Sequence, residues 1–501
     1  MMRVSEKVTV QEINQWKDGD IITIKAGCGA GKSYFIKNIL YAIAKRDNKK
    51  ILMLIHRSNC VNQFLTEIEL DDLNKLEYID IKTYQDLEAK DRYKKPINLD
   101  EYGYIISDEF HYFMSDASFN KFTDISLNLI LAASNQIRIF MSATGDYMTS
   151  YISNVKKQST INYELPINYK FIKHLEFFHQ EGTIHKYIKL AIENNVKGIF
   201  FIESAKKAYE LHKQYPEHSL FNCSKSNNEY YQYVDKDKID TMLKNEKFDE
   251  LFLFTTTCMD AGVNIVDDDL HDIVVDVGLD IGQIIQSIGR KRLKNSNDYV
   301  NVHIKSISNK QLGGKETQLK KRVEMADYFR MYGANSYVDK FYREVDRYHI
   351  VYDHPTSFGY EKRLNNLMYF NVKTTLAEVD KMKYFGEWGF CKYVADYFDI
   401  KSYYIAEDEV KTLDLENYLE SVVGKILYSA EQDELKEKFK TNGLKARTMG
   451  INTLNGNLKD RKLPYIINSE TDNRRNITVD EVKVKNPHFR KVYWIVGKIT
   501  Y

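Results

Sequence analysis

The sequence predicts an α/β protein with two parallel β-sheets, followed by a helical region and a C-terminal unit of helices and a hairpin. Over the first 310 residues, short Ile/Val/Leu/Phe runs alternate with longer amphipathic stretches. This alternation is typical of parallel sheets covered by helices on both faces. A polar stretch at 154–170 divides the runs into two sets, and the runs stop near residue 307.

The expected strands are nearly continuous apolar runs rich in β-branched and aromatic residues. The first set is 21–26, 49–56, 77–83, 102–109 and 136–144. The second set is 174–180, 197–204, 218–224, 250–257, 272–278 and 299–306. Two such sets predict two α/β domains, with boundaries at 1–160 and 161–310.

After residue 310 the sequence predicts a mainly helical accessory region, 311–410, because helical spacing replaces the β-runs. Residues 411–501 then follow the order helix, helix, helix, strand, turn, strand, which is typical of a winged helix. Residues 440–501 contain 13 Lys/Arg against 5 Asp/Glu, leaving 59 against 66 for the rest of the chain. A basic C-terminal unit favours nucleic acid as a partner, with Arg474 and Arg475 on the predicted wing meeting phosphates, although protein docking stays open.

Composition and the N-terminal sequence narrow the possible classes of protein. The net charge of +1 favours no partner by itself, and no segment is apolar for long enough to span a membrane. The N-terminus has no apolar signal-peptide core, so we expect a cytoplasmic protein. Five scattered cysteines, without CxxC or Cys/His spacing, argue against a disulfide framework and a zinc site.

A glycine-rich turn lies between the first expected strand and a helix. Its residues are Ala26, Gly27, Cys28, Gly29, Ala30, Gly31, Lys32 and Ser33. Glycines allow a tight turn whose backbone N–H groups point at phosphate oxygens, and the helix N-terminus adds partial positive charge. Lys32 would reach the β- and γ-phosphates and Ser33 would ligate Mg²⁺, so the turn predicts a P-loop that binds ATP and Mg²⁺.

A second acidic site follows the expected strand 102–109. Hydrolysis of ATP at a P-loop needs carboxylates at the end of a neighbouring strand, to hold the metal and to polarise the attacking water. Asp108 is the expected Mg²⁺ ligand, and Glu109 is the expected general base.

With His111, these residues spell D-E-F-H, and the sequence resembles the DExH-box helicases and translocases of superfamily 2. The resemblance covers residues 20–305, and its specificity lies in the order of the motifs. They are LIHRSNCVNQF (motif Ia), IKTYQDL, SAT (motif III), GIFFIESAKKAYEL (motif IV), TTTCMDAGVNI (motif V) and QIIQSIGRKR (motif VI). The resemblance implies that both α/β domains are RecA-like lobes of an ATPase that acts on nucleic acid.

Site residues carry over where the motifs match. Gln286 would face the γ-phosphate and the attacking water, and Arg290 would be the arginine finger. Coupling between the lobes is implied for His111, Ser142, Thr144 and Gly262. Nucleic-acid contacts are implied for Arg57, Ser58, Thr83, Ser204, Thr256 and Thr257.

Two positions depart from the family pattern. The usual second arginine of motif VI is replaced by Leu293, with Arg292 one residue early. Either Arg292 reaches the same phosphate from a shifted turn, or the ATPase relies on one finger. The usual aspartate of motif V is Asn264, which leaves the contact made by that side chain open.

The expected function is an ATP-dependent helicase or translocase on nucleic acid, with DNA favoured over RNA, in replication or repair. The Lys/Asn/Ile/Tyr-rich usage fits an AT-rich phage or mobile element. One alternative is a nucleotide-gated binding or remodelling ATPase without processive unwinding. Another is the motor subunit of a defence or restriction assembly.

Overall fold

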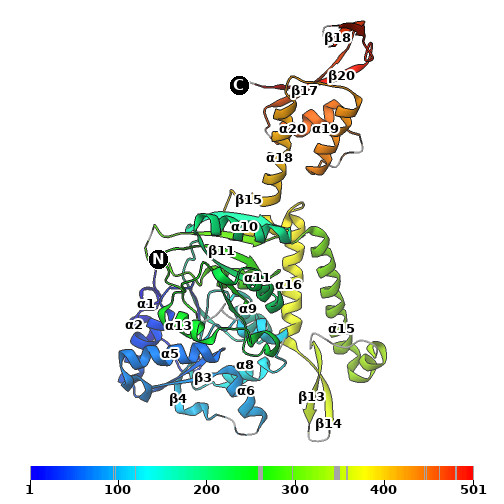
Figure 1. The fold of residues 1–501 in the computed structure, drawn as a ribbon. Helices are drawn as coiled ribbons and strands as arrows, with labels where there is room; N and C mark the ends of the chain where they lie inside the picture. Colours follow the sequence, from blue (N-terminus) through cyan, green and yellow to red (C-terminus); the bar gives the residue numbers. More distant parts are fainter. Residues whose placement is uncertain are drawn as a thin grey trace. The chain divides into compact units, whose positions relative to one another are not determined.

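The computed structural model describes residues 2–93, 95, 97–118, 120–257, 263–295, 297–342, 350–356, 359–444, 446, 448–461, 463–479 and 482–499. The chain divides into two compact units (Figure 1). The first unit is Met1–Leu175 with Lys186–Tyr403, and the second is Glu176–His185 with Tyr404–Tyr501.

The first unit begins with a six-stranded sheet of order β3-β2-β4-β5-β1-β6, in which every pair is parallel. Its strands are β1 (Ile21–Lys25), β2 (Lys50–Ile55), β3 (Ile79–Thr83), β4 (Tyr102–Asp108), β5 (Ile137–Ser142) and β6 (Ile161–Glu164). Strands β1, β2, β4 and β5 are buried along almost their whole length. Burial on both faces explains why these runs are continuously apolar.

Helices cover this sheet and complete what we call the first lobe. They are α1 (Val4–Lys7), α2 (Val10–Ile13), α3 (Lys32–Tyr34), α4 (Tyr41–Arg46), α5 (Ser58–Asp71), α6 (Tyr84–Arg92), α7 (Tyr112–Ser115), α8 (Thr123–Ala132) and α9 (Asp146–Ser150). A π-helical segment, Phe35–Leu40, joins α3 to α4. Ile22 and Ile24 of β1 pack in one core with Phe35 and Leu40, so the helix that follows the P-loop is anchored to the sheet.

The second sheet has the order β15-β7-β12-β11-β8-β10-β9. Its strands are β7 (Ile172–Phe178), β8 (Lys197–Ile202), β9 (Ser219–Asn222), β10 (Phe252–Thr255), β11 (Leu270–Asp276), β12 (Val300–Lys305) and β15 (Tyr404–Ile405). The pairs β9–β10, β10–β8, β8–β11 and β11–β12 are parallel. The second lobe is this sheet with α10 (Glu181–Asn194), α11 (Ala205–Gln214), α12 (Asn228–Tyr231), α13 (Lys236–Asn245) and α14 (Ile281–Ile288). The prediction of two parallel-sheet lobes is confirmed.

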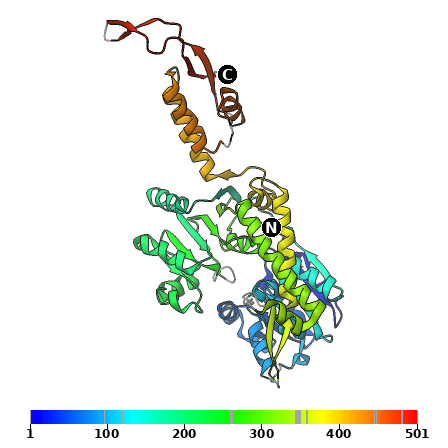
Figure 2. The same ribbon diagram turned by 90° about the vertical axis from the view of Figure 1, so that its right-hand side faces the viewer.

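The accessory region contains α15 (Asn309–Phe341), α16 (Asn366–Tyr384) and α17 (Gly389–Tyr397). Helices α15 and α16 lie side by side in both Figure 1 and Figure 2. Gly333 has φ 77° and ψ −176°, so α15 is two helices joined at this glycine. Across the described residues, none of the helices combines the length and apolarity needed to cross a membrane.

The accessory region also contains a hairpin, β13 (Val351–Thr356) and β14 (Gly359–Leu364), which the sequence analysis did not predict. The sequence signal is weak because β14 is largely exposed and carries Glu361, Lys362 and Arg363. Pro355 further obscures β13, because it lacks the N–H that a central strand requires.

The second unit consists mainly of α18 (Ala406–Val422), β16 (Ile426–Leu427), α19 (Ser429–Thr441), α20 (Ile451–Asp460), β17 (Tyr465–Thr471), β18 (Asn476–Val479), β19 (Val482–Lys485) and β20 (Val492–Lys498). Strands β16, β20 and β17 form an antiparallel sheet, while β18 and β19 form a separate ribbon. Helix α18 ends at Val422, and Gly424, with φ 72°, redirects the chain into β16. The winged-helix assignment stays a prediction.

Two expected boundaries differ from the observed pairing. Strand β6 begins at Ile161 and pairs with β1, so the first sheet continues beyond residue 160. Thr23 Oγ1 donates to Asn162 Oδ1 at 2.6 Å, which ties this linker to the first lobe. The second unit includes Tyr404, before the expected boundary at 411, because β15 pairs with the end of β7.

Candidate active site

The turn that follows β1 is shaped as a phosphate-binding loop. Gly29 and Gly31 have φ values of 77° and 82°, a left-handed conformation that residues with a Cβ atom rarely adopt. Lys32 begins α3 directly after Gly31, and its Nζ donates to the Ala26 carbonyl oxygen at 3.0 Å. Residues 26–33 therefore form a turn with its lysine folded inside, at the start of a helix.

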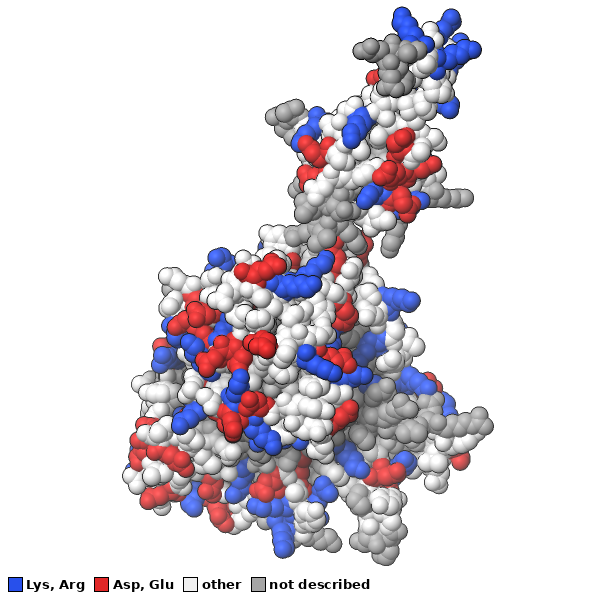
Figure 3. Space-filling view, in the orientation of Figure 1, with Lys and Arg blue, Asp and Glu red and all other residues white. Residues whose placement is uncertain are grey.

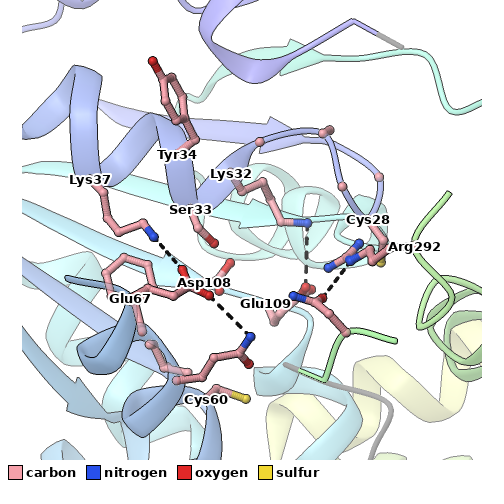
Figure 4. A pocket seen from close by; sticks show the side chains of 18 of the residues that line it. Cys28, Lys32, Ser33, Tyr34, Lys37, Cys60, Glu67, Asp108, Glu109 and Arg292 are labelled. Carbon is pink, nitrogen blue, oxygen red and sulfur yellow. Dashed lines mark hydrogen bonds and ion pairs between the residues drawn. The ribbon is translucent and has the colours of Figure 1, made fainter. Parts of the chain in front are cut away.

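A cavity of about 810 Å³ opens over this turn. Its lining includes residues 27–34, Asp108 and Glu109 of the first lobe and Asn264, Arg290 and Arg292 of the second lobe. Figure 4 shows Lys32, Asp108, Glu109 and Arg292 pointing into a common space. Ligand sites of about 300–1,000 Å³ are usual for small molecules, so the cavity has the size of a nucleotide site. The fold thus brings together residues that the sequence places in three separate motifs.

Glu109 faces Lys32 across the cavity. Its φ of 48° is uncommon for a residue with a Cβ atom, and its Oε1 lies 3.7 Å from Lys32 Nζ. Burial alone would raise the pKa of Glu109, but Lys32 and then His111 hold that pKa well below its usual value. Burial would lower the pKa of Lys32, but Glu109 raises it above its usual value. Glu109 is therefore ionised, which is the state that a general base requires.

Asp108 differs from Glu109 in its hydrogen bonding and in the direction of its pKa shift. Its Oδ1 is buried, with no hydrogen-bond partner among the described residues. Burial, and then the charge of Glu109, raise the pKa of Asp108. A carboxylate oxygen left unsatisfied in this way fits a divalent cation that prefers oxygen ligands, and the exposed Ser33 lines the same cavity. Asp108 and Ser33 therefore fit the Mg²⁺ ion that the sequence implies.

A chain of hydrogen bonds connects the second lobe to Glu109. Gln286 Nε2 lies 2.7 Å from His111 Nε2, and His111 Nδ1 lies 2.9 Å from Ser142 Oγ. Ser142 Oγ in turn donates to Glu109 Oε2 at 3.3 Å, and the Thr144 N–H donates to Ser142 Oγ at 3.0 Å. Because an amide N–H donates to His111 Nε2, the geometry is satisfied by a histidine protonated on Nδ1. Three of the expected coupling residues therefore form one relay across the lobes; Gly262 lies outside the described residues.

Arg290 reaches the cavity from the end of α14 and is 3% exposed. Its Nε donates to the Gln286 carbonyl oxygen at 3.0 Å, and its Nη1 donates to the Val263 carbonyl oxygen at 3.2 Å. Its Nη2 lies 3.5 Å from Cys28 Sγ in the P-loop. Two carbonyl oxygens orient the guanidinium without cancelling its charge, so the expected finger lies charged beside the loop.

Arg292 lines the same cavity, although the family spacing would place the second arginine at position 293. Ile265 and Lys291 form a parallel bridge, in which the Ile265 N–H donates to Arg290 O and the Arg292 N–H donates to Ile265 O, each at 2.9 Å. Side chains alternate along such an extended segment. Arg290 and Arg292 therefore share the cavity face, while Lys291 is buried elsewhere, with its Nζ 2.5 Å from Asp267 O.

Asn264 orients Arg292. Arg292 Nε donates to Asn264 Oδ1 at 2.7 Å, and Asn264 Nδ2 donates to Glu246 Oε1 at 3.1 Å. Arg292 Nη1 is buried, without a hydrogen-bond partner among the described residues, and lies 3.6 Å from where a Cβ atom on Gly29 would stand. Burial lowers the pKa of Arg292 from its usual value. The two residues that depart from the family pattern, Asn264 and Arg292, are therefore hydrogen-bonded to each other. Because the Asn264 amide is neutral, it does not neutralise the charge of Arg292.

Gly289 allows the second lobe to approach the P-loop. A Cβ atom at this position would lie 2.6 Å from Cys28 Sγ and 3.0 Å from Cys28 Cβ. The φ of −70° suits any residue, so Gly289→Ala adds contact without backbone strain. Overpacking of this kind costs about 1–3 kcal/mol, so we expect ATP turnover to fall at least about fivefold.

Steady-state phosphate release checks this prediction. Adding Cys28→Gly removes both atoms of the clash, and the double variant is expected to regain part of the rate relative to Cys28→Gly alone. Parental turnover by Gly289→Ala would mean that hydrolysis does not need this close approach.

The expected nucleic-acid contacts lie at or after the ends of parallel strands. Arg57 follows β2, and its Nε lies 3.0 Å from His56 Nε2. Thr83 accepts from the Asp86 N–H at 3.1 Å and caps α6. The side chain of Ser58, at the start of α5, lies outside the described residues.

Three further expected contacts follow strands of the second lobe. Ser204 follows β8, accepts from the Lys207 N–H at 3.4 Å and caps α11. Thr256 is 8% exposed and Thr257 is half-buried, both directly after β10. Helix capping accounts for the hydroxyls of Thr83 and Ser204, so strand contact by these residues stays a prediction.

The sequence analysis missed a polar group on another wall of the cavity. Lys37 Nζ lies 2.5 Å from Glu67 Oε2, and Gln63 Nε2 donates to Glu67 Oε1 at 3.4 Å (Figure 4). Lys37 belongs to the helix after the P-loop, whereas Gln63 and Glu67 belong to α5. No sequence signal singles them out, because they share a wall only once these two helices lie side by side.

A nucleotide held by one lobe and reached by arginines of another is hydrolysed only when both lobes contribute, and this split design is that of superfamily 2 helicases. The motifs and the two-lobed site of this chain resemble those of superfamily 2 helicase-type ATPases. In agreement, residues 2–146 match the family model described as "Type III restriction enzyme, res subunit". This match covers most of the first lobe, including its P-loop and D-E-F-H sequence.

A comparison with curated proteins gives no match. Among solved structures, a variant of S. cerevisiae Dbp5 bound to RNA and ADP BeF3 is 15% identical, covers 59% of this chain and 81% of its own, and has a TM-score of 0.46. The DEAD-box helicase Mss116 bound to ssRNA and UDP-BeF is 15% identical, covers 74% of this chain and 86% of its own, and also has a TM-score of 0.46. Because both TM-scores are below 0.5, neither likeness carries an argument about this chain.

Proposed function

We propose that the chain is an ATP-dependent translocase or helicase that moves along nucleic acid, with DNA favoured over RNA. The observation that carries the proposal is the single cavity to which the first lobe contributes the P-loop and the second lobe contributes Arg290 and Arg292. Hydrolysis then depends on contact between the lobes, so each turnover changes how they meet. Such alternation moves a motor along a strand that both lobes hold.

In the proposed reaction, the P-loop turn and Lys32 bind the β- and γ-phosphates of ATP. Mg²⁺, held by Ser33 and Asp108, would supply positive charge to the phosphate oxygens. Glu109 accepts a proton from the attacking water, which its low pKa allows because it is ionised. Arg290 and Arg292 stabilise the negative charge that develops on the transferred phosphoryl group.

The relay through Gln286, His111 and Ser142 makes Glu109 responsive to the second lobe. Gln286 donates to His111 only while the lobes are in contact, and that bond fixes which nitrogen of His111 carries the proton. His111 then donates to Ser142, which donates to Glu109. In this proposal, separation of the lobes releases the orientation of the general base.

The strand would be held by backbone groups and small polar side chains of both lobes. The proposed contacts are Arg57, Ser58 and Thr83 from the first lobe and Ser204, Thr256 and Thr257 from the second. These groups suit phosphate and sugar rather than base edges, so the core of the motor should be largely indifferent to sequence.

The test compares ATP turnover with single-stranded DNA, duplex DNA, RNA and no nucleic acid, and measures strand displacement in parallel. We expect DNA to stimulate turnover most, and Lys32→Ala to abolish the stimulated and basal rates. Stimulation without displacement or movement would favour the remodelling ATPase. Turnover that no nucleic acid changes would overturn the proposal.

The res-subunit match favours a second version, in which the chain is the motor of a restriction or defence assembly acting on DNA. Purification from the native host tests it. A nuclease chain that copurifies in fixed proportion would support this version, whereas an isolated motor active alone would favour replication or repair.

A further inference from the structure

The second unit carries a two-stranded ribbon with a polar face. Strands β18 and β19 pair only with each other, with Asn476 opposite Lys485, Ile477 opposite Val484 and Thr478 opposite Lys483. Opposite residues point to the same side of an antiparallel pair, and successive residues point to opposite sides. One face therefore presents Lys483 and Lys485 with Asn476 and Thr478.

Asp472 fixes the base of this ribbon and is 2% exposed. Its carboxylate accepts from Arg474 Nε at 2.9 Å and Nη2 at 2.7 Å, from Tyr428 Oη at 2.6 Å and from Asn486 Nδ2 at 2.9 Å. The Tyr428 ring stacks on His488 with centroids 3.7 Å apart. Hydrogen bonds from Arg474 and then Tyr428 hold the pKa of Asp472 well below its usual value, so the anchor stays ionised.

This anchor changes what Arg474 is expected to do. The sequence analysis placed Arg474 with Arg475 as phosphate contacts on the wing. Two nitrogens of the Arg474 guanidinium are bonded to one buried carboxylate, a strong bidentate arrangement. Arg474 therefore orients the ribbon, and Arg475 keeps the predicted role.

Within the part of the chain that the structure describes, the basic side chains around the ribbon other than Arg474 form no ion pairs. Among the described residues, no ion pair involves the exposed side chains of Arg475, Lys483, Lys485, Arg490 or Lys491. Elsewhere in the same unit, Lys436 pairs with Asp433 and Lys440 pairs with Glu437. Figure 3 shows Lys and Arg gathered at the end of this unit where Figure 1 labels β18. Like charges held together on a fixed ribbon favour an extended anion as a partner.

We propose that the β18–β19 ribbon binds the phosphate backbone of duplex DNA, through Lys483 and Lys485 on its polar face and through Arg475, which directly precedes β18. A two-stranded ribbon fits the major groove of B-form DNA, whereas the major groove of duplex RNA is too narrow for side chains to enter. Lys483 and Lys485 stand two residues apart on one strand, about 7 Å along it, so both reach one groove. The inference rests on the proposed function only for the choice of DNA, and the ribbon acts without nucleotide.

The test measures binding of the full-length chain to a labelled mixed-sequence DNA duplex by fluorescence anisotropy, without ATP, over a range of salt concentrations. The test variant combines Arg475→Gln, Lys483→Gln and Lys485→Gln. The matched control combines Lys425→Gln, Lys436→Gln and Lys440→Gln, which removes the same charge from other parts of the unit.

We expect the ribbon variant to lose about tenfold or more in affinity at low salt. The slope of log K against log salt concentration should become shallower by about 0.9 for each lost phosphate contact. The control variant should stay within about twofold of the parent. Equal losses in both variants, or none in the ribbon variant, would overturn the proposal. Tighter ribbon-dependent binding of single-stranded DNA or duplex RNA would overturn the assignment to duplex DNA.

Two measurements, ATP turnover and duplex binding, distinguish this proposal from the proposed motor function. Basal ATP turnover of the ribbon variant should equal that of the parent, which also shows that the unit with the nucleotide site is folded. If no nucleic acid stimulates turnover but duplex binding still depends on the ribbon, the motor proposal fails and the ribbon proposal stands. If stimulation persists while the ribbon variant binds like the parent, the ribbon proposal alone fails.

Discussion

Glu109→Gln is expected to stop ATP turnover while nucleotide binding is retained. The amide keeps the shape of the side chain but accepts no proton from water, and loss of a general base typically costs about 10²–10⁴ in rate. Glu109 is the carboxylate whose pKa lies well below its usual value, beside Lys32 and His111. Phosphate release measures turnover, and titration with a fluorescent ATP analogue measures binding.

Two further variants make the result interpretable. Glu101→Gln changes an exposed carboxylate of the same lobe and should turn over like the parent. Glu109→Asp keeps a carboxylate at a greater distance and should retain more activity than Glu109→Gln. Parental turnover by Glu109→Gln would place the general base elsewhere.

Arg292→Ala is expected to slow turnover by a factor similar to that of Arg290→Ala, about 10³-fold or more for an arginine finger. Both side chains line the cavity from one extended segment, and Arg292 Nη1 is buried without a partner among the described residues. Single-turnover phosphate release at saturating ATP separates this effect from weaker binding. A loss confined to Arg290→Ala would mean that one finger suffices.

Asn264→Asp tests the same arrangement through its partner. A carboxylate at this position would pair with Arg292 Nε, 2.7 Å from the present amide oxygen, and would hold its charge away from phosphate. We expect slower turnover, and we expect the effect to disappear in an Arg292→Ala background, as a double-mutant cycle requires of interacting residues. An unchanged effect in that background would mean that Asn264 acts independently of Arg292.

Local sequence patterns were sufficient to predict the two lobes and the P-loop. Strands buried on both faces are continuously apolar, which makes β1, β2, β4 and β5 visible in the sequence. The left-handed turns at Gly29 and Gly31 require glycine, so the loop also leaves a sequence signal. The β13–β14 hairpin leaves only a weak sequence signal, because β14 is largely exposed and needs no apolar alternation.

The order of the motifs also fixed the expected roles of Asp108, Glu109 and Arg290, but it could not decide between one finger and two. That decision depends on the direction of a side chain, and direction depends on whether residues 290–292 continue the helix or become extended. The bridge of Lys291 to Ile265 makes them extended, so the spacing that aligns two side chains is two residues instead of three or four.

The sequence by itself determined two parallel-sheet lobes, a phosphate-binding loop and an acidic pair, because each is encoded by neighbouring residues. Only the tertiary structure decided that Arg292 joins Arg290 in the cavity, that Asn264 orients it and that Arg474 is an anchor. Each of these outcomes depends on a partner distant in sequence or on a backbone turn, and a linear pattern records neither the distance nor the direction of a side chain.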